Sequence, residues 1–345
     1  MIEVKNLVKM YGNHLAVDDI SFTLEPGRVY GFLGPNGAGK STTMNIMTGY
    51  IAPTSGEIII NDHNIMDEPE EAKACMGYLP EMPPLYNDMK VYEYLKFVAG
   101  LKHIKRSERK AAIEEVMQVT GITEYQNRLI SSLSKGYKQR VGLAQAIIAK
   151  PEIIILDEPT VGLDPRQIIE IRDLIRSLGK KHTVILSSHI FQEISAVCDY
   201  IIIIARGHLI ASDTPANLIN KYASDKELTL KVRGNLGDVT STLNRIEDAI
   251  NVRTTPSFVE NDCIDVTLNT RDNKDIREDI FNAFAEDGLP ILELKSSDPS
   301  LEDIFLELTA REEEEAIRRE EKEMVDRFSS YETVKDDEFD EGGEA

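Results

Sequence analysis

One loop carries the clearest chemistry in the sequence. The stretch is Gly34-Pro35-Asn36-Gly37-Ala38-Gly39-Lys40-Ser41-Thr42, and its first eight residues match G-x-x-x-x-G-K-[ST], the pattern of a glycine-rich loop that cradles phosphates. Glycines let the backbone approach an anion closely, and successive N–H groups then point inward. Lys40 is placed to reach the β- and γ-phosphates of a nucleotide, and the Ser41 hydroxyl is placed to bind Mg²⁺. The loop therefore predicts a nucleotide-binding site.

The segments on either side of this loop favour the same interpretation. Residues 29–33 read as a short buried strand, and residues 42–49 read as a helix. The N-terminus of such a helix directs about half a positive charge toward bound phosphates. The alternative is a glycine-rich turn without a ligand. Because a plain turn needs neither the strand nor the helix, the context favours the phosphate loop.

Two adjacent acidic residues end another apolar segment. Residues 152–158 form an almost continuous apolar run that finishes with Asp157 and Glu158, which indicates a parallel strand buried on both faces. Open α/β sheets bind ligands at the carboxyl ends of such strands. Strand-end solvation is the alternative, but two acids on a buried strand are costly without a metal. A second strand, over residues 182–188, leads directly to His189.

The remaining pattern predicts how an α/β domain of residues 1–222 positions these groups. Further strands are expected over residues 2–10, 20–25, 57–61 and up to 81. A helical insertion over residues 85–150 is expected to contain helices at 86–102, 107–120 and 136–150. A hairpin over 200–206 and 208–211 and a helix over 214–222 complete the domain. The expected fold class is thus α/β, a phosphate-loop nucleotide-hydrolase sheet with an antiparallel N-terminal part.

A smaller α+β domain is expected over residues 227–310, after a linker at 223–226. Its strand–helix–strand–strand–helix–strand order is the ferredoxin-like pattern, and a final helix over 300–310 has an apolar face. A regulatory or dimer-contact role is favoured over an inert appendage. Residues 311–345 contain fifteen acidic and six basic side chains, a net charge of −9. We expect a charged helix over 312–327 and a solvated, partly disordered acidic tail.

Composition limits the function classes. The chain has 345 residues and a formal net charge of −21, which argues against a nucleic-acid surface. Its three cysteines are far apart and in no metal spacing, which suits a reducing cytosol. The N-terminus reads as an amphipathic strand rather than a signal peptide. No apolar run approaches the ~20 residues of a membrane span, so work at a membrane would need a spanning partner.

The order of five motifs indicates which family of nucleotide-binding proteins the chain resembles. Residues 133–140, Leu-Ser-Lys-Gly-Tyr-Lys-Gln-Arg, precede the acidic strand by about one helix, and Val161-Gly162-Leu163-Asp164 follows it. With the phosphate loop, the acidic strand and His189, these motifs resemble the nucleotide-binding subunits of ABC transporters over residues 1 to about 222. The resemblance implies that the chain binds ATP with Mg²⁺ and hydrolyses it.

Within one chain, the resemblance implies five roles. Tyr11 would stack on adenine, the loop from Gly34 to Thr42 would hold the phosphates, and Asp157 would hold Mg²⁺ with Ser41. Glu158 would polarise the attacking water, and His189 would contact the γ-phosphate. Each residue also has a plainer alternative. Tyr11 alone fits an exposed aromatic residue, and His189 alone fits a satisfied core histidine.

Across two chains, the resemblance implies a shared site. Ser134 and Gly136 would reach the γ-phosphate bound by a facing copy, and Asp164 would touch that copy. Ser134 also fits a helix cap, which is compatible because both roles use the positive end of the helix. Asp164-Pro165 also fits a plain turn. The partner would be a second copy or a homologous ATPase subunit.

Three residues depart from the family pattern. Glu81 stands where the family usually has Gln, and remains a candidate Mg²⁺ ligand although it cannot donate a hydrogen bond. Gliding-motility ATPases resemble this chain in having Glu there. Lys135 and Tyr137 replace a glycine and a glutamine of the signature motif. Lys135 would either add a cation near the partner's phosphate or face solvent.

Residues 298–305 resemble the tail domains of drug- and antibiotic-exporter ATPases of the bacitracin and daunorubicin type. We therefore expect an exporter ATPase that works with a separate membrane permease and lies in the cytoplasm, on the inner face of the cell membrane. Two alternatives remain. One is a soluble ABC protein acting on ribosomes or DNA, and the other is a regulatory module that binds ATP and only gates a permease.

Overall fold

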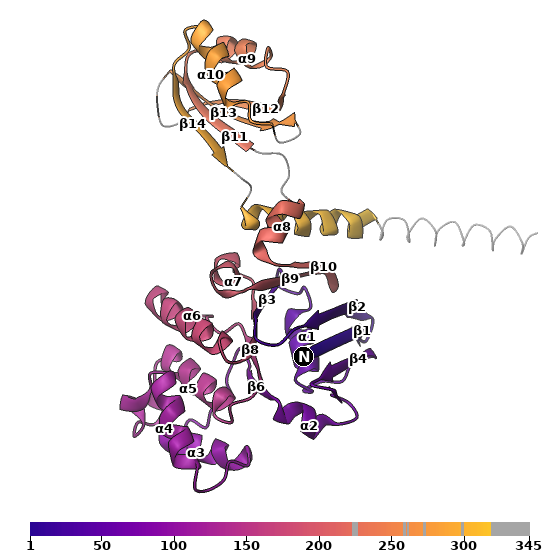
Figure 1. Cartoon of the computed structure of the whole chain (residues 1–345), viewed down its shortest axis with the longest axis vertical. Coiled ribbons are helices and arrows are strands. Elements are labelled where there is room, and N and C mark those ends of the chain that lie inside the picture. The colour runs from indigo at the N-terminus through magenta and orange to yellow at the C-terminus, as the bar shows by residue number, and fades with distance from the viewer. Residues whose placement is uncertain (223–226, 258–259, 261, 272–273, 298–299, 319–345) are drawn as a thin grey trace, which may run out of the picture. The chain divides into compact units, whose positions relative to one another are not determined.

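The computed structural model describes residues 1–222, 227–257, 260, 262–271, 274–297 and 300–318 (Figure 1). The chain folds as two compact units. The first contains Met1–Pro215 and the described residues from Glu307 onward, and the second contains Ala216–Leu306. The linker expected at 223–226 and most of the expected acidic tail lie outside the described residues.

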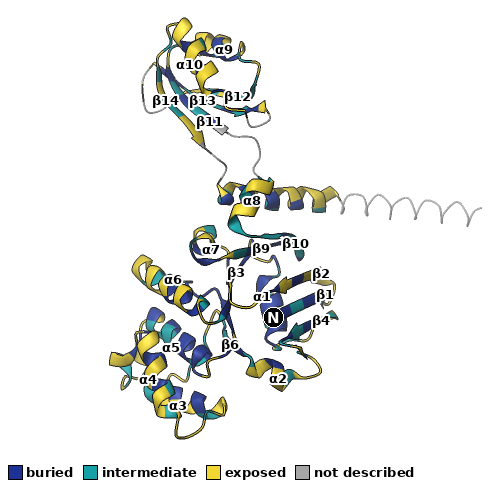
Figure 2. Ribbon diagram, viewed as in Figure 1, coloured by how far each residue is buried: buried dark blue, intermediate teal, exposed yellow. Residues whose placement is uncertain are grey.

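The first unit begins with a four-stranded antiparallel sheet in the order β2-β1-β4-β5. Its strands are β1 (Ile2–Tyr11), β2 (His14–Leu24), β4 (Ser55–Ile60) and β5 (His63–Asn64). Ile2, Val4 and Leu7 are buried, whereas the residues between them are more exposed (Figure 2). The expected antiparallel N-terminal part is confirmed.

A six-stranded mixed sheet, in the order β10-β9-β3-β8-β7-β6, forms the centre of this unit. Its strands are β3 (Val29–Leu33), β6 (Met76–Leu79), β7 (Ile153–Asp157), β8 (Thr183–Ser188), β9 (Tyr200–Ala205) and β10 (His208–Asp213). All neighbouring strands are parallel except the edge pair β9–β10. Every residue of β7 and β8 is buried, as their continuous apolar runs predict.

Helices follow most strands of this sheet. In chain order they are α1 (Lys40–Met47), α2 (Pro69–Ala74), α3 (Val91–Leu101), α4 (Arg109–Val119), α5 (Lys135–Ile147), α6 (Pro165–Gly179) and α7 (Phe191–Val197). The region between β6 and β7 contains α3, α4 and α5. Helix α3 begins five residues later than the expected Tyr86, because the backbone N–H of Lys90 bonds the Glu93 carboxylate, 3.2 Å away, and starts the helix there.

Helix α6 was not among the elements expected from the sequence. Asp164-Pro165 also fits a turn, whereas in the structure Asp164 is the N-cap of a 15-residue helix and accepts a 2.9 Å bond from the backbone N–H of Gln167. Proline at the first helical position is compatible with this start. The buried side chains of Ile171, Ile175 and Leu178 follow the helical period. The helical spacing of these apolar residues was therefore a signal for α6 in the sequence, and it was missed.

The second unit is a four-stranded antiparallel sheet in the order β12-β13-β11-β14 with two helices (Figure 1). Helix α8 (Pro215–Tyr222) precedes this sheet. The strands and the two helices are, in chain order, β11 (Glu227–Arg233), α9 (Leu236–Leu243), β12 (Ala249–Pro256), β13 (Cys263–Thr270), α10 (Arg277–Glu286) and β14 (Ile291–Ser297). Side chains such as Leu230, Val266 and Phe284 form a core of its own.

A last helix occupies residues 301–318. Leu301, Ile304, Phe305 and Leu308 are buried, which agrees with the apolar face expected for this segment. The remainder of the charged helix expected to residue 327 lies outside the described residues. Among the helices that the structure describes, none combines the length and apolarity needed to cross a bilayer.

Close packing of β6 on α5 yields a stability prediction. A Cβ atom at Gly77 would lie 2.0 Å from the backbone oxygen of Ala146, so Gly77→Ala must push the helix away from the sheet. Overpacking of this kind costs about 1–3 kcal/mol. We expect a lower melting temperature by differential scanning fluorimetry. Gly100→Ala in α3 is the control, because its nearest neighbour is 3.5 Å away and alanine favours a helix. Equal melting temperatures for the two variants would contradict the packing.

Candidate nucleotide site

The glycine-rich loop joins β3 to α1, as the sequence predicts. Gly37 and Gly39 have φ values of +80° and +101°, a region that other residues rarely adopt. A Cβ atom at Gly39 would also lie 2.6 Å from the backbone oxygen of Ala16. Helix α1 begins at the next residue, so its free N–H groups lie at the end of the loop. The backbone geometry therefore suits a bound anion.

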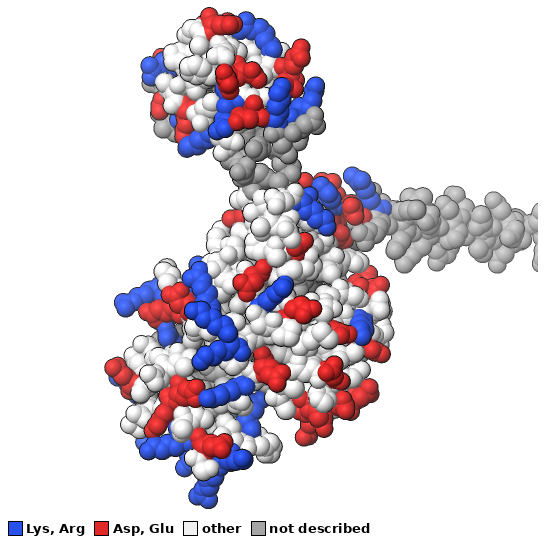
Figure 3. Space-filling model, viewed as in Figure 1, with Lys and Arg blue, Asp and Glu red and all other residues white. Residues whose placement is uncertain are grey.

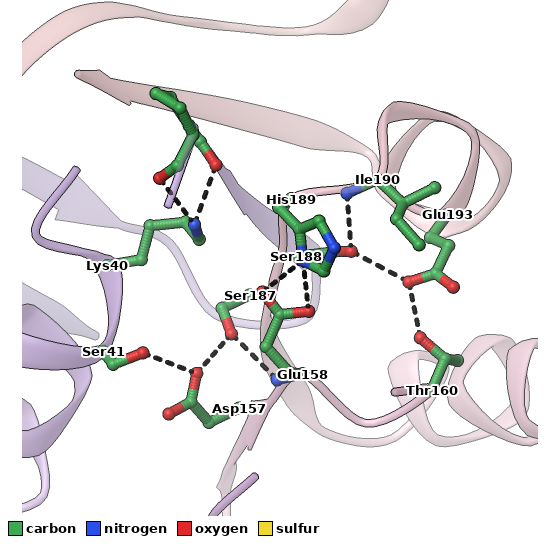
Figure 4. Close-up of polar contacts among 12 residues, drawn as sticks. Lys40, Ser41, Asp157, Glu158, Thr160, Ser187, Ser188, His189, Ile190 and Glu193 are labelled. Atoms are coloured by element: carbon green, nitrogen blue, oxygen red, sulfur yellow. Dashed lines mark hydrogen bonds and ion pairs between the residues drawn. The ribbon is translucent and has the colours of Figure 1, made fainter. Parts of the chain in front are cut away.

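Lys40 is the buried cation of this loop. Its side chain is 6% exposed, and its ammonium donates to the backbone oxygens of Gly34, at 2.8 Å, and Pro35, at 3.1 Å (Figure 4). Burial lowers the pKa of Lys40, while the nearby carboxylates of Glu158 and Asp157 oppose that change. The loop's own carbonyl groups thus hold the ammonium in place at the position where phosphates would bind.

Asp157 lies at the carboxyl end of β7 and faces the start of α1. Its Oδ1 atom is 3.4 Å from the Ser41 hydroxyl and accepts a 2.5 Å bond from the Ser187 hydroxyl (Figure 4). Ser187 also accepts the backbone N–H of Glu158 at 2.9 Å. The sequence analysis assigned Ser187 no role. The signal available was a pair of serines ending an otherwise apolar strand.

Glu158 and His189 face each other across the ends of β7 and β8. The His189 Nδ1 atom lies 3.0 and 3.1 Å from the two carboxylate oxygens of Glu158 (Figure 4). Burial raises the pKa of Glu158, and His189 and Lys40 partly counter this effect. The φ value of Glu158 is +46°, a conformation that costs about 1–3 kcal/mol and persists only where the surroundings enforce it. Strain of this kind is typical of functional sites.

One cavity of about 390 Å³ unites most of the predicted site. Its lining residues are Tyr11, His14, Ala16, Asn36, Gly37, Ala38, Gly39, Lys40, Ser41, Thr42, Glu81, Glu158, Val161 and His189. Tyr11 is 48% exposed, and the Lys9 ammonium lies over its ring, 5.1 Å from the centroid. His14 and Val161 were not predicted to line the site. The cavity shape and the groups around it suit a nucleotide with its phosphates at the loop.

The oxygen atoms near the loop fit a magnesium ion. Mg²⁺ prefers oxygen ligands and usually takes one or two from the protein, with phosphates and water supplying the rest. The Ser41 hydroxyl and the Asp157 carboxylate adjoin each other and meet this requirement. Glu81 lines the same cavity. In the part of the chain that the structure describes, no three acidic, histidine or cysteine side chains form a complete metal cluster.

The signature residues lie outside this cavity. Ser134 is the N-cap of α5 and accepts the backbone N–H of Tyr137 at 3.4 Å, as its predicted capping role requires. Gly136 is buried at the same helix end, and a Cβ atom there would lie 2.4 Å from the Gln167 side-chain oxygen. Asp164 caps α6. None of Ser134, Gly136 and Asp164 lines the cavity of its own chain.

The two departures in the signature have partners within the chain. The Lys135 amine lies against Gly162, where a Cβ atom would be only 2.2 Å from its nitrogen. Tyr137 stacks on Tyr125, with ring centroids 4.0 Å apart. Lys135 therefore contacts the loop after β7 in its own chain, an arrangement that the sequence analysis did not consider.

Comparison with known proteins adds independent evidence. Residues 17–161 match the family model described as ABC transporter. The chain is 31% identical to the linearmycin resistance ATP-binding protein of Bacillus subtilis, over 90% of this chain and 99% of the relative. It is 34% identical to the bacitracin transport ATP-binding protein of Bacillus licheniformis, over 89% of this chain and 97% of the relative.

Solved structures agree with these relatives. An ATP-binding subunit of an ABC transporter superposes with a TM-score of 0.60 at 29% identity, covering 64% of this chain and 93% of that one. A dimeric ATP-binding cassette in a post-hydrolysis state, bound to ADP and phosphate, superposes with a TM-score of 0.57 at 25% identity. It covers 62% of this chain and 98% of that one. Together with the near-complete match to the two Bacillus proteins, this similarity shows that the chain belongs to the ATP-binding subunits of ABC transporters, which hydrolyse ATP to drive transport.

Proposed function

We propose that this subunit powers an exporter. The observation that carries the proposal is similarity along nearly the whole length of the bacitracin transport and linearmycin resistance ATP-binding proteins, including the second unit. In this proposal two ATP-binding subunits pair on ATP and act on a separate transmembrane permease. The subunit then lies in the cytoplasm, on the inner face of the cell membrane.

Glu158 is the proposed group that orients and polarises the attacking water. Its carboxylate lines the cavity and is held by His189, which in turn is placed to contact the γ-phosphate. Lys40 and the loop N–H groups bind the phosphates, and Tyr11 stacks on adenine. Ser41 and Asp157 would hold Mg²⁺, which supplies charge neutralisation when bound, and Glu81 remains a third candidate ligand. Catalysis then rests on positioning and charge stabilisation.

Ser134, Gly136 and Asp164, which lie outside the cavity of their own chain, suit a role at the nucleotide site of the facing subunit. In the proposed pair the N-terminus of α5, with Ser134 and Gly136, meets the γ-phosphate bound by the partner, with Asp164 at the same interface. Figure 3 shows basic side chains over α5 and α6 with acidic side chains among them, and Glu170 pairs with both Arg140 and Arg166. The dimeric relative supports the pairing of two subunits.

The second unit is the proposed accessory domain. Its strand order β12-β13-β11-β14 with two helices supports a ferredoxin-like fold. The second compact unit spans Ala216–Leu306. The proposed division is a nucleotide-binding domain over residues 1–222, an accessory domain over 227–310 and a tail over 311–345. A regulatory or dimer-contact role remains our hypothesis for the accessory domain.

Replacing the proposed catalytic carboxylate tests hydrolysis and pairing together. Glu158→Gln keeps the side-chain size but removes the negative charge that polarises water. We expect ATP binding to survive while turnover falls about 10²–10⁴-fold, the usual worth of a positioned general base. Unhydrolysed ATP should then hold two chains together as a dimer in gel filtration with ATP and Mg²⁺.

Glu152→Gln is the matched control, because Glu152 is an exposed acid at the opposite end of the same strand. It should hydrolyse ATP at the normal rate and elute as wild type does. Normal turnover by Glu158→Gln would remove its catalytic role and would favour the regulatory alternative. An inactive Glu158→Gln variant that stays monomeric would argue against the paired site.

The raised pKa of Glu158 predicts a pH dependence. The carboxylate must be charged to polarise water, and its pKa in the nucleotide-free chain lies above the ordinary value of 4.5 because of burial. As the pH falls, protonation therefore begins at a higher pH than for an exposed glutamate. We expect kcat/KM for ATP to decline on the acidic side of neutrality, since this parameter reports the free enzyme.

Measurement of kcat/KM from about pH 5 to 8, with folding checked by circular dichroism at each pH, examines this prediction. The residual activity of Glu158→Gln should lack the acidic decline. If the acidic limb is identical in wild type and Glu158→Gln, the titrating group is not Glu158.

The exporter assignment predicts a hydrophobic partner. The tagged full chain, purified from native membranes in mild detergent, should bring down an integral membrane protein that mass spectrometry identifies. The tagged chain expressed without the permease should wash off membranes in high salt, because no described helix can span them. Recovery of ribosomal proteins or DNA in place of a permease would support the soluble, non-transport alternative.

A further inference from the structure

The loops after β7 and β8 are joined at two levels. At the cavity, Ser187 bonds Asp157 and the backbone of Glu158, and His189 contacts the Glu158 carboxylate. Behind these groups lies a second set of contacts that none of the roles above uses. It consists of Thr160, two residues after Glu158, Ser188, immediately before His189, and Glu193 in the first turn of α7 (Figure 4).

Glu193 is the centre of this second set. One of its carboxylate oxygens, Oε2, accepts a 2.5 Å bond from the Thr160 hydroxyl and a 2.9 Å bond from the Ser188 hydroxyl. The Ser188 hydroxyl also accepts the backbone N–H of Ile190 at 3.0 Å. Glu193 and Thr160 are each 4% exposed, and Ser188 is fully buried. One carboxylate therefore bridges the loop that carries Glu158 and the loop that carries His189.

The burial of Glu193 needs an explanation. In the described part of the chain, no Lys, Arg or His side chain forms an ion pair with it, so the two hydroxyls are its hydrogen-bond donors. A carboxylate buried without a cation is costly, and an apolar side chain at this position would serve a purely structural purpose at lower cost. The bonds it makes are charge-assisted and stronger than bonds between neutral groups. These bonds reach Thr160, two residues after Glu158, and Ser188, next to His189, which links the cost to the site.

We propose that Glu193 is a positioning residue for ATP hydrolysis, which holds the loops after β7 and β8 at the spacing that Glu158 and His189 need. This inference rests on the roles proposed above for Glu158 and His189. The strained backbone of Glu158 needs surroundings that enforce it, and Thr160 is anchored close by. A shift of about 1 Å in a reacting group can cost 10²-fold in rate, so a fixed spacing between two loops matters.

The test removes the bridge without disturbing its shape. Thr160→Val is close to isosteric and deletes one donor to Glu193, whereas Thr160→Ser keeps the hydroxyl. For the full chain we expect Thr160→Val to lower kcat about tenfold, equal to 1.4 kcal/mol of barrier, with KM for ATP within about twofold of wild type. Thr160→Ser should recover most of that loss. Glu193→Gln, which keeps the side-chain size, should change kcat in the same direction as Thr160→Val.

A double-variant cycle separates positioning from general stability. If the bridge acts by placing the Glu158 carboxylate, Thr160→Val should lower single-turnover hydrolysis less than about twofold in a Glu158→Gln background. A tenfold loss in both backgrounds would overturn the proposal and indicate a structural role. A wild-type kcat for Thr160→Val would overturn it as well. Normal turnover by Glu158→Gln itself would instead remove the proposed catalytic role of that residue, so the two failures are distinguishable.

Discussion

Three charged groups buried at one edge of the sheet impose the main constraint on this molecule. Lys40, Asp157 and Glu158 are each less than a tenth exposed, and a buried charge is tolerated only with good partners. Loop carbonyls hold the ammonium, a serine hydroxyl bonds Asp157, and His189 contacts Glu158. These partners are mostly neutral groups. They hold each charged side chain in place, and the three charged side chains do not pair with one another at contact distance. A site arranged in this way can meet the charge of a triphosphate with little rearrangement.

The parallel arrangement of β3, β8 and β7 brings these groups together. Because the three strands are neighbours and run in one direction, the loops at their carboxyl ends open on the same edge of the sheet. The first carries the phosphate loop, the second carries His189 and the third carries the two acids. Glu193 adds a further connection, since its bonds to Thr160 and Ser188 join the loop after β7 to the end of β8.

The signature region, unlike the groups above, does not line the cavity of its own chain. Ser134 and Asp164 begin adjacent helices, and the chain packs their ends tightly: Lys135 lies against Gly162 and Gln167 lies beside Gly136. Since these contacts lie outside the cavity, they shape a surface rather than the chain's own site. The ends of α5 and α6 are consequently presented as one unit, which is what a site shared between two subunits requires.

The phosphate loop, the acidic strand, His189 and the antiparallel and parallel β segments could be predicted from the sequence, because glycine spacing, apolar runs and strand-end acids are local signals. Helix α6 was missed although its apolar residues follow the helical period, because Asp164-Pro165 also fits a turn. The sequence also did not reveal the partners of Lys135 or the roles of Ser187 and Glu193. Hydroxyl and carboxylate groups far apart in the chain acquire such roles only when strand order places their loops side by side. The identity of the partners follows from the fold, since hydrogen bonds across a sheet edge depend on which strands are neighbours, and local sequence does not specify that order.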